Sequence, residues 1–127
     1  MMTYSQSSGL FTMPDVTTFH GHAGHGDGLN NPDMQDVHMV GPLPQGLYNL
    51  GPFQDGSAYS AADARLGPFV SRLTPDAENT MFGRDGFFIH GGNNSNPPTD
   101  SDGCIILQHP NRQTISDSGE TQLTVVA

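Results

Sequence analysis

The chain contains no lysine and only four arginines, so its 13 acidic residues leave a formal net charge of −9. Proteins that bind nucleic acids or anionic membrane surfaces carry clusters of basic side chains. Four cations cannot supply such a cluster, so we expect no nucleic-acid partner. Because cations are so few, the arginines are the only side chains with a fixed positive charge that can hold a carboxylate. They are Arg65, Arg72, Arg84 and Arg112.

Long apolar runs are also missing, because no stretch approaches the roughly 18 residues of a membrane span. We therefore expect no membrane insertion. Residues 1–13 lack the basic start and apolar stretch of a secretory signal, which predicts a protein made in the cytoplasm without a signal peptide. Cys104 is the single cysteine, so an internal disulfide is excluded.

Glycine and proline are abundant, with 16 and 10 residues among 127. This share stays below the roughly 25–30% that is typical of disordered chains. The length predicts one domain over residues 1–127. Short apolar stretches alternate with turn residues, which favours a mostly β sandwich or barrel with one or two short helices.

The element pattern can be placed along the chain. A hairpin is expected within 3–12, and further strands over 16–19, 47–50, 69–73, 86–91, 104–107 and 123–126. Short helices are expected over 33–39, after the capping sequence Asn31-Pro32-Asp33, and over 110–115. Loops are expected over 20–31, 54–64 and 92–103.

Two residues whose side chains are suited to catalysis lie at the two ends of one predicted loop. His90 ends an apolar strand before Gly91-Gly92, and Cys104 begins another strand after Ser101-Asp102-Gly103. A cysteine nucleophile needs a base within hydrogen-bond reach, and an imidazole can take the thiol proton. Gly103 leaves the backbone open, so that N–H groups near Cys104 can point at a developing oxyanion. The alternative interpretation gives both residues a purely structural role, as a buried cysteine and a hydrogen-bonded core histidine. The glycines after His90, the Ser-Asp-Gly sequence before Cys104 and the lack of a second cysteine favour the catalytic interpretation.

The stretches Phe88-Ile89-His90-Gly91 and Ser101-Asp102-Gly103-Cys104-Ile105 resemble the signature of the L,D-transpeptidases, which is His-Gly, a short loop, then Ser-x-Gly-Cys. Upstream stretches are similar to the small L,D-transpeptidase effectors of type VI secretion. These are Tyr4 with Ser8-Gly9-Leu10, Asn30-Asn31-Pro32, 41–48 and 83–91. The resemblance covers nearly the whole chain, although residues 54–64 match no part of it.

The resemblance implies an L,D-transpeptidase-like β fold and a cysteine enzyme acting on peptidoglycan stem peptides. In that reading Cys104 attacks the third residue of a tetrapeptide stem, terminal D-Ala leaves, and a thioester forms. His90 shuttles the proton, and Ser101 orients the imidazole or lines the pocket. The resemblance implies no cofactor. It also implies secretion machinery, an immunity protein as partner, and action in the periplasm of a target bacterium.

The chain departs from the family next to the nucleophile, where Asp102 stands in place of a basic residue. An acid facing the sulfur would raise the thiol pKa, so we expect Asp102 to point away. Arg84 is expected to replace the missing charge. Gly91, Asp102, Tyr48 and Arg112 complete the predicted substrate contacts. For Arg112 the alternatives are a carboxylate clamp and a structural partner of carbonyl groups.

A second group of polar residues comprises His20, His22, His25 and Asp27. Its spacing resembles a binuclear zinc motif, but Gly24 stands where that motif needs an aspartate. The open alternatives are a metal site, a flexible loop over the substrate cleft and a plain surface loop. We expect no metal.

Three other functions stay open from the sequence. One is a catalytically inactive module that binds peptidoglycan. Another is a cysteine hydrolase of a different peptide substrate. The third is a metal-binding protein built on the histidine cluster.

Overall fold

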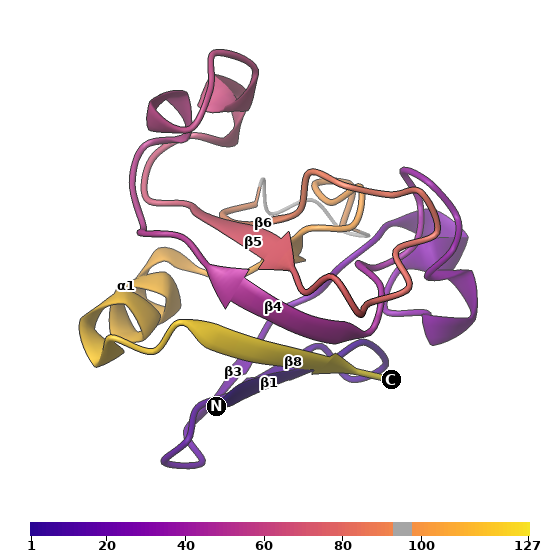
Figure 1. The fold of residues 1–127 in the computed structure, drawn as a ribbon, viewed down its shortest axis with the longest axis horizontal. Coiled ribbons are helices and arrows are strands. Elements are labelled where there is room, and N and C mark those ends of the chain that lie inside the picture. The colour runs from indigo at the N-terminus through magenta and orange to yellow at the C-terminus, as the bar shows by residue number, and fades with distance from the viewer. Residues whose placement is uncertain (93–97) are drawn as a thin grey trace.

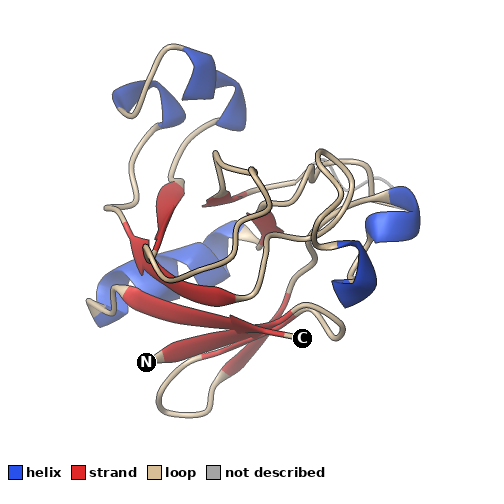
Figure 2. Ribbon diagram, turned by 45° about the vertical axis from the view of Figure 1, so that its right-hand side comes forward, coloured by secondary structure: helices blue, strands red, loops and turns tan. Residues whose placement is uncertain are grey.

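The structure is a computed structural model that describes residues 1–92 and 98–127. Its strands form one eight-stranded sheet in the order β3-β2-β1-β8-β4-β5-β6-β7. The strands are β1 (Met2–Ser5), β2 (Leu10–Thr12), β3 (Thr18–His20), β4 (Gly46–Leu50), β5 (Ser71–Pro75), β6 (Phe88–His90), β7 (Ile105–Ile106) and β8 (Gln122–Val126). The sheet curls strongly (Figures 1 and 2), and the mostly β fold expected from the sequence is confirmed.

The predicted N-terminal hairpin is present as the antiparallel pair β1–β2. The next strand begins later than predicted. Val16 has a φ of 65°, and the Val16 N–H donates to Met13 O, so Val16 belongs to the turn that precedes β3. β3 then pairs with β2 from Thr18 to His20.

The last strand, β8, lies in the middle of the sheet. It runs parallel to β1 and antiparallel to β4. The first and last strands of the chain are therefore paired side by side in the sheet. One face of these strands is buried, with Tyr4, Tyr48, Leu123 and Val125 all at 2% exposure or less. Burial of such side chains stabilises the fold by about 1.5–3 kcal/mol each.

The strands that carry the candidate site follow at the other end of the sheet. β5 starts at Ser71 because Phe69 has a φ of 59° and turns the chain. β6 is shorter than predicted, with three buried residues, and β7 pairs with it in parallel through Ile89 and Ile105. The segment between β6 and β7 is therefore a crossover that returns to the same end of the sheet. The predicted loop over 92–103 lies partly outside the described residues.

Helical segments are short except for α1 (His109–Ser118), which extends beyond the predicted 110–115 and is followed by its C-cap residue Gly119, with a φ of 73°. The segment predicted as a helix over 33–39 is the 3-10 turn η2 (Pro32–Met34), and the Asn31 side chain caps it as expected. The predicted loops contain η1 (Gly26–Gly28) and η3 (Gly56–Ala58), and η4 (Ala62–Leu66) begins within the predicted loop 54–64 and ends after it. Figure 1 shows η3 and η4 in a segment that projects from the sheet between the end of β4 and the start of β5. Within the described residues, no helix has the length and apolar character needed to cross a bilayer.

Candidate active site

His90 ends β6 with its side chain only 8% exposed. Its Nδ1 lies 2.7 Å from Gly91 O. A carbonyl oxygen only accepts hydrogen bonds, so Nδ1 carries the proton and Nε2 keeps a free lone pair. Burial lowers the pKa of His90 below its usual value, which the Gly91 contact and the charge of Asp100 partly oppose. The imidazole is therefore neutral near pH 7 and able to accept a proton at Nε2.

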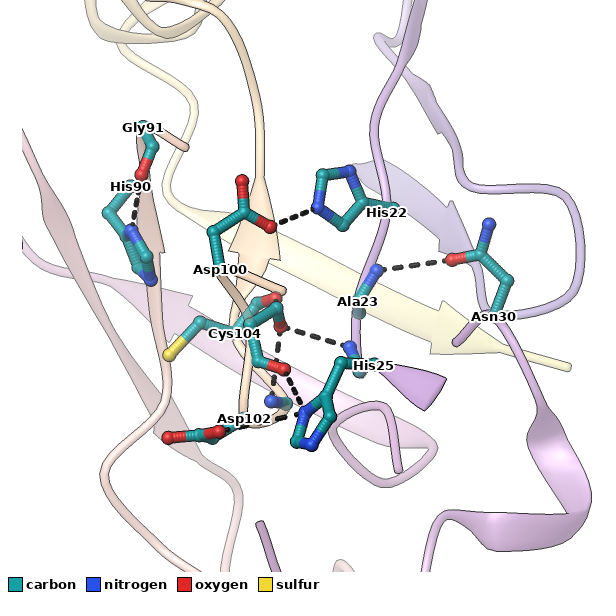
Figure 3. A network of polar contacts seen from close by, with 12 residues as sticks. His22, Ala23, His25, Asn30, His90, Gly91, Asp100, Asp102 and Cys104 are labelled. Carbon is teal, nitrogen blue, oxygen red and sulfur yellow. Dashed lines mark hydrogen bonds and ion pairs between the residues drawn. The ribbon is translucent and has the colours of Figure 1, made fainter. Parts of the chain in front are cut away.

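Cys104 stands at the end of the crossover, just before β7, and is partly exposed. Figure 3 shows its sulfur pointing toward the strand that carries His90. The Phe88 N–H donates to Cys104 Sγ at 3.3 Å. Burial raises the pKa of the Cys104 thiol to about 11, although this N–H and the charges of Arg65 and Arg84 act in the opposite direction. The resting site therefore holds a neutral thiol beside a neutral imidazole.

A cavity of about 310 Å³ is lined by both Cys104 and His90. A second cavity of about 500 Å³ lies on another side of His90. The two share Arg65, His90 and Asp100, so they meet at the imidazole. A substrate can therefore extend from the cysteine past the histidine.

Ser101 is almost fully buried and binds the turn that presents Cys104. Its Oγ donates to Cys104 O at 2.6 Å and accepts the N–H groups of Gly24 and Gly103. These contacts use the hydroxyl on backbone atoms, in place of the predicted contact with the imidazole. Ser101 thus fixes the turn that carries the nucleophile.

Gly103 cannot be replaced without strain in this turn. Its φ of 138° disfavours any residue with a Cβ. A Cβ added there would also lie 2.7 Å from Arg84 Nη2 and from Phe87 Cε1. The glycine therefore permits both the turn geometry and the close approach of Arg84.

Arg84 lines the cavity of Cys104, as predicted, but most of its guanidinium is used by the protein. Nη1 donates to Gln35 O and Pro42 O, and Nη2 donates to Gly41 O and Asp102 O, all within 3.1 Å. The side chain is 6% exposed. Arg84 therefore ties residues 35–42 to the nucleophile turn and supplies positive charge near the thiol.

Arg112 and Tyr48 were both predicted to contact substrate. Arg112 is 6% exposed and donates to the carbonyl oxygens of Leu107, Pro68 and Phe69, which favours the structural alternative, although it also lines the cavity beyond His90. Tyr48 is fully buried, and its hydroxyl donates to Pro44 O at 2.7 Å. Its position in the core corrects the expectation that it binds substrate.

Asp102 lines the cavity of Cys104, and its charge raises the thiol pKa. The expectation that it points away from the sulfur is therefore wrong. Gly91, also predicted, lines the cavity beyond His90 and holds the imidazole through its carbonyl.

The histidine-rich segment packs against the nucleophile turn. His22 Nε2 lies 2.6 Å from Asp100 Oδ1, and His25 Nδ1 lies 2.9 Å from Ser101 O (Figure 3). In the described part of the chain, no group of three His, Cys, Asp or Glu side chains is arranged to hold a metal ion. These histidines brace the backbone around the site.

Two features of the site were missed from the sequence. The Phe88 N–H is a backbone donor, which no sequence pattern reveals. Arg65 was noted only as one of four cations, and it follows directly after residues 54–64, which match no part of the resemblance. It is exposed and lines both cavities at His90.

The sequence model of the Tlde1 domain matches residues 17–127. The chain belongs to the Tlde1 domain family. Comparison with curated protein sequences finds no match. Among solved structures, the Tlde1 chain is similar to L,D-transpeptidase 1 of Mycobacterium tuberculosis, with 16% identity and a TM-score of 0.55. The match covers 99% of this chain and 58% of the transpeptidase chain.

These findings confirm the resemblance to the L,D-transpeptidase superfamily and to its small type VI effectors. At this identity, the structural likeness establishes the fold.

Proposed function

We propose that this protein is a cysteine-dependent peptidoglycan enzyme that acts on tetrapeptide stems as an L,D-carboxypeptidase and L,D-transpeptidase. The observation that carries the proposal is the placement of Cys104 and His90 in one cavity, with the Nδ1–H of His90 bound to Gly91 O. That hydrogen bond leaves Nε2 as the proton acceptor. Membership of the Tlde1 family and the transpeptidase fold support the substrate class.

In the first half-reaction, His90 Nε2 takes the thiol proton as Cys104 Sγ attacks the carbonyl carbon of the third stem residue. The Cys104 N–H is suited to stabilise the oxyanion that forms. The intermediate collapses, the bond to terminal D-Ala breaks, and His90 returns the proton to the leaving amine. A thioester on Cys104 remains.

In the second half-reaction, His90 takes a proton from the incoming nucleophile, which attacks the thioester carbon. Water gives a tripeptide and completes the carboxypeptidase reaction. The amine of a D-amino acid or of a second stem gives an exchanged or cross-linked product. The thiolate leaves and recovers the proton from His90.

The raised pKa of Cys104 determines how the proton must move in these steps. A thiol with a pKa of about 11 is almost fully protonated at pH 7, so the resting enzyme is not an ion pair. Proton transfer to His90 must accompany the attack on the substrate. The Phe88 N–H, which donates to Cys104 Sγ, stabilises the negative charge that sulfur carries when the thiolate leaves in the second half-reaction.

We further propose that the protein is an antibacterial effector made in the cytoplasm, secreted by a type VI machine and active in a target periplasm. A producing cell with its own wall then needs an immunity protein. Co-purification with a dedicated binding partner from the producing cell tests this part. Failure to find any inhibitor of the activity contradicts it.

The experiment that tests the activity uses purified tetrapeptide muropeptides, incubated with the protein or with Cys104→Ala, with and without a D-amino acid. Masses are followed by chromatography and mass spectrometry. The proposal predicts loss or replacement of terminal D-Ala only with the intact cysteine. An unchanged profile contradicts it.

A peptidoglycan-binding module without turnover is the second candidate. The burial that raises the Cys104 pKa favours it, because a protonated thiol is a poor nucleophile. Such a module predicts equal binding of intact peptidoglycan by the wild-type protein and Cys104→Ala, with no change in muropeptide masses.

A further inference from the structure

Arg65 differs from the other three arginines in its surroundings. Arg84 and Arg112 are buried against backbone carbonyls, and the guanidinium of Arg72 lies 5.7 Å from the centre of the Phe88 ring. Arg65 is exposed and lines both cavities that meet at His90. Within residues 1–92 and 98–127, it forms no ion pair. It is therefore a cation that is available to an anionic ligand at the site.

The segment that carries Arg65 is fixed to the strand beside the nucleophile. The next residue, Leu66, is 8% exposed and packs in a small cluster with Val70 and Phe88. Cys104 packs against the same cluster. The two ends of the segment are joined by a hydrogen bond, in which the Gly56 N–H donates to Gly67 O at 2.9 Å. Arg65 thus has a defined position relative to Cys104.

We propose that Arg65 binds the α-carboxylate of the D-amino acid that leaves the stem peptide or is added to it. This inference rests on the proposed function and names the residue that selects the leaving and incoming groups. The amine that departs and the amine that attacks are bonded to the same carbonyl carbon, and each exchanges its proton with His90. By microscopic reversibility, both amino acids occupy one subsite.

The carboxylate of this amino acid is attached to the carbon that bears the reacting amine. When the amine lies at His90, the carboxylate must lie within the cavities that meet there. Asp102 lines the Cys104 cavity but not the cavity beyond His90, so its charge repels a carboxylate from the wall of the Cys104 cavity. Arg65 attracts it. The charges therefore orient the terminal residue with its carboxylate toward η4.

The electrostatic effect of Arg65 on the reacting groups agrees with this placement. Its charge lowers the pKa of both Cys104 and His90. The positive field of this guanidinium therefore reaches the position of a ligand held between the two groups.

The test compares two stems, one ending in D-Ala and one ending in D-alaninamide, with four proteins. These are the wild type, Arg65→Gln, Arg65→Lys and the matched control Arg72→Gln. Loss of a charged hydrogen bond is expected to lower kcat/KM for the acid about 10- to 100-fold in Arg65→Gln, with little effect on the amide. The KM for an added D-amino acid rises by a similar factor. Arg65→Lys restores part of the loss, and Arg72→Gln matches the wild type.

Every other outcome contradicts the inference, and each one identifies which step of the argument is wrong. Equal losses on acid and amide would mean that Arg65 only supports the structure. Unchanged kinetics would mean that it does not bind the carboxylate. A defect in exchange alone would contradict the shared subsite. A wild-type protein that cleaves neither stem contradicts the proposed function itself, and this inference with it.

Discussion

Two segments face the same cavity and are built in opposite ways. The nucleophile turn, residues 98–104, uses its polar groups on itself and on neighbouring backbone, through Ser101 and the Arg84 contact to Asp102 O. The η3–η4 segment, residues 55–67, is joined at its two ends by the hydrogen bond from Gly56 N–H to Gly67 O and is turned locally by contacts such as that of Ser60 with Asp63, but it leaves Arg65 exposed. The first segment is organised to hold one reactive atom in place. The second is organised to present a charge to a ligand.

This contrast predicts that substitutions in the nucleophile turn affect stability, whereas substitutions in the η3–η4 segment affect substrate choice. Three pairs of variants and one measurement of thiol reactivity can break or sharpen it.

The largest effect on stability is expected for Arg84→Gln. It removes a buried cation and leaves the carbonyls of Gln35, Gly41, Pro42 and Asp102 without their donor. Breaking such a buried charged network costs about 3–5 kcal/mol. Arg65→Gln, at an exposed position, is expected to change stability by less than about 0.5 kcal/mol. Urea unfolding of both variants measures the difference, and similar midpoints would contradict the contrast.

Gly103→Ala and Gly67→Ala form the next pair. Both glycines have positive φ, at 138° and 81°. A Cβ at Gly103 meets Arg84 and Phe87, whereas a Cβ at Gly67 meets open space. Backbone strain costs each variant about 1–2 kcal/mol. Overpacking adds about 1–3 kcal/mol at Gly103 alone.

Thermal unfolding of the two alanine variants, together with the tetrapeptide assay, tests this prediction. Gly103→Ala should also lose activity, because the displaced backbone carries Cys104. A variant of Gly103 as stable and active as that of Gly67 would contradict the close packing of the turn.

Ser101→Ala and Ser60→Ala compare two serines that bind local backbone. Ser101 Oγ is buried with three backbone partners, so its loss is expected to cost about 1–3 kcal/mol. Ser60 Oγ donates to Asp63 Oδ2 and accepts the Asp63 N–H in a partly exposed turn. Its loss is expected to cost about 0.5–1 kcal/mol. Equal unfolding free energies for the two variants would argue against the bracing role of Ser101.

The smallest effect concerns the reactivity of the thiol. Because the pKa of Cys104 is raised to about 11, only the small thiolate fraction reacts with iodoacetamide at pH 7. The alkylation rate is expected to rise about tenfold per pH unit up to roughly pH 10. Arg65→Gln should slow alkylation further, since the charge of Arg65 lowers this pKa. A rate that is already flat above pH 7 would contradict the neutral thiol.

The sequence predicted those parts of the molecule that depend on local pattern. The hairpin of β1 and β2, the position of β4, and the His90 and Cys104 strands follow from apolar stretches between turn residues. Their mutual placement depends on long-range pairing. Nothing local indicates that β8 lies between β1 and β4, or that β6 and β7 run parallel.

Prediction of the site from the sequence has the same limit, because it also depends on long-range contacts. His90 and Cys104 belong to a recognisable motif, but the contacts of the arginines depend on which carbonyls the fold leaves unpaired. Arg84 and Tyr48 both occur in stretches that resemble the effectors, yet Arg84 lines the cavity and Tyr48 lies in the core. Arg65 follows directly after residues 54–64, which match no part of the resemblance, so only the fold reveals that it lines a cavity together with His90.

The central claim is that Cys104 forms a thioester with the stem peptide and that His90 assists its formation. The most direct measurement is the mass of the intact protein, quenched in acid during incubation with a tetrapeptide stem. The account predicts an acyl-tripeptide adduct on Cys104 that is absent in Cys104→Ala and forms about 10²- to 10⁴-fold more slowly in His90→Gln. Cleavage of the stem by Cys104→Ala, or an adduct on another residue, would contradict it.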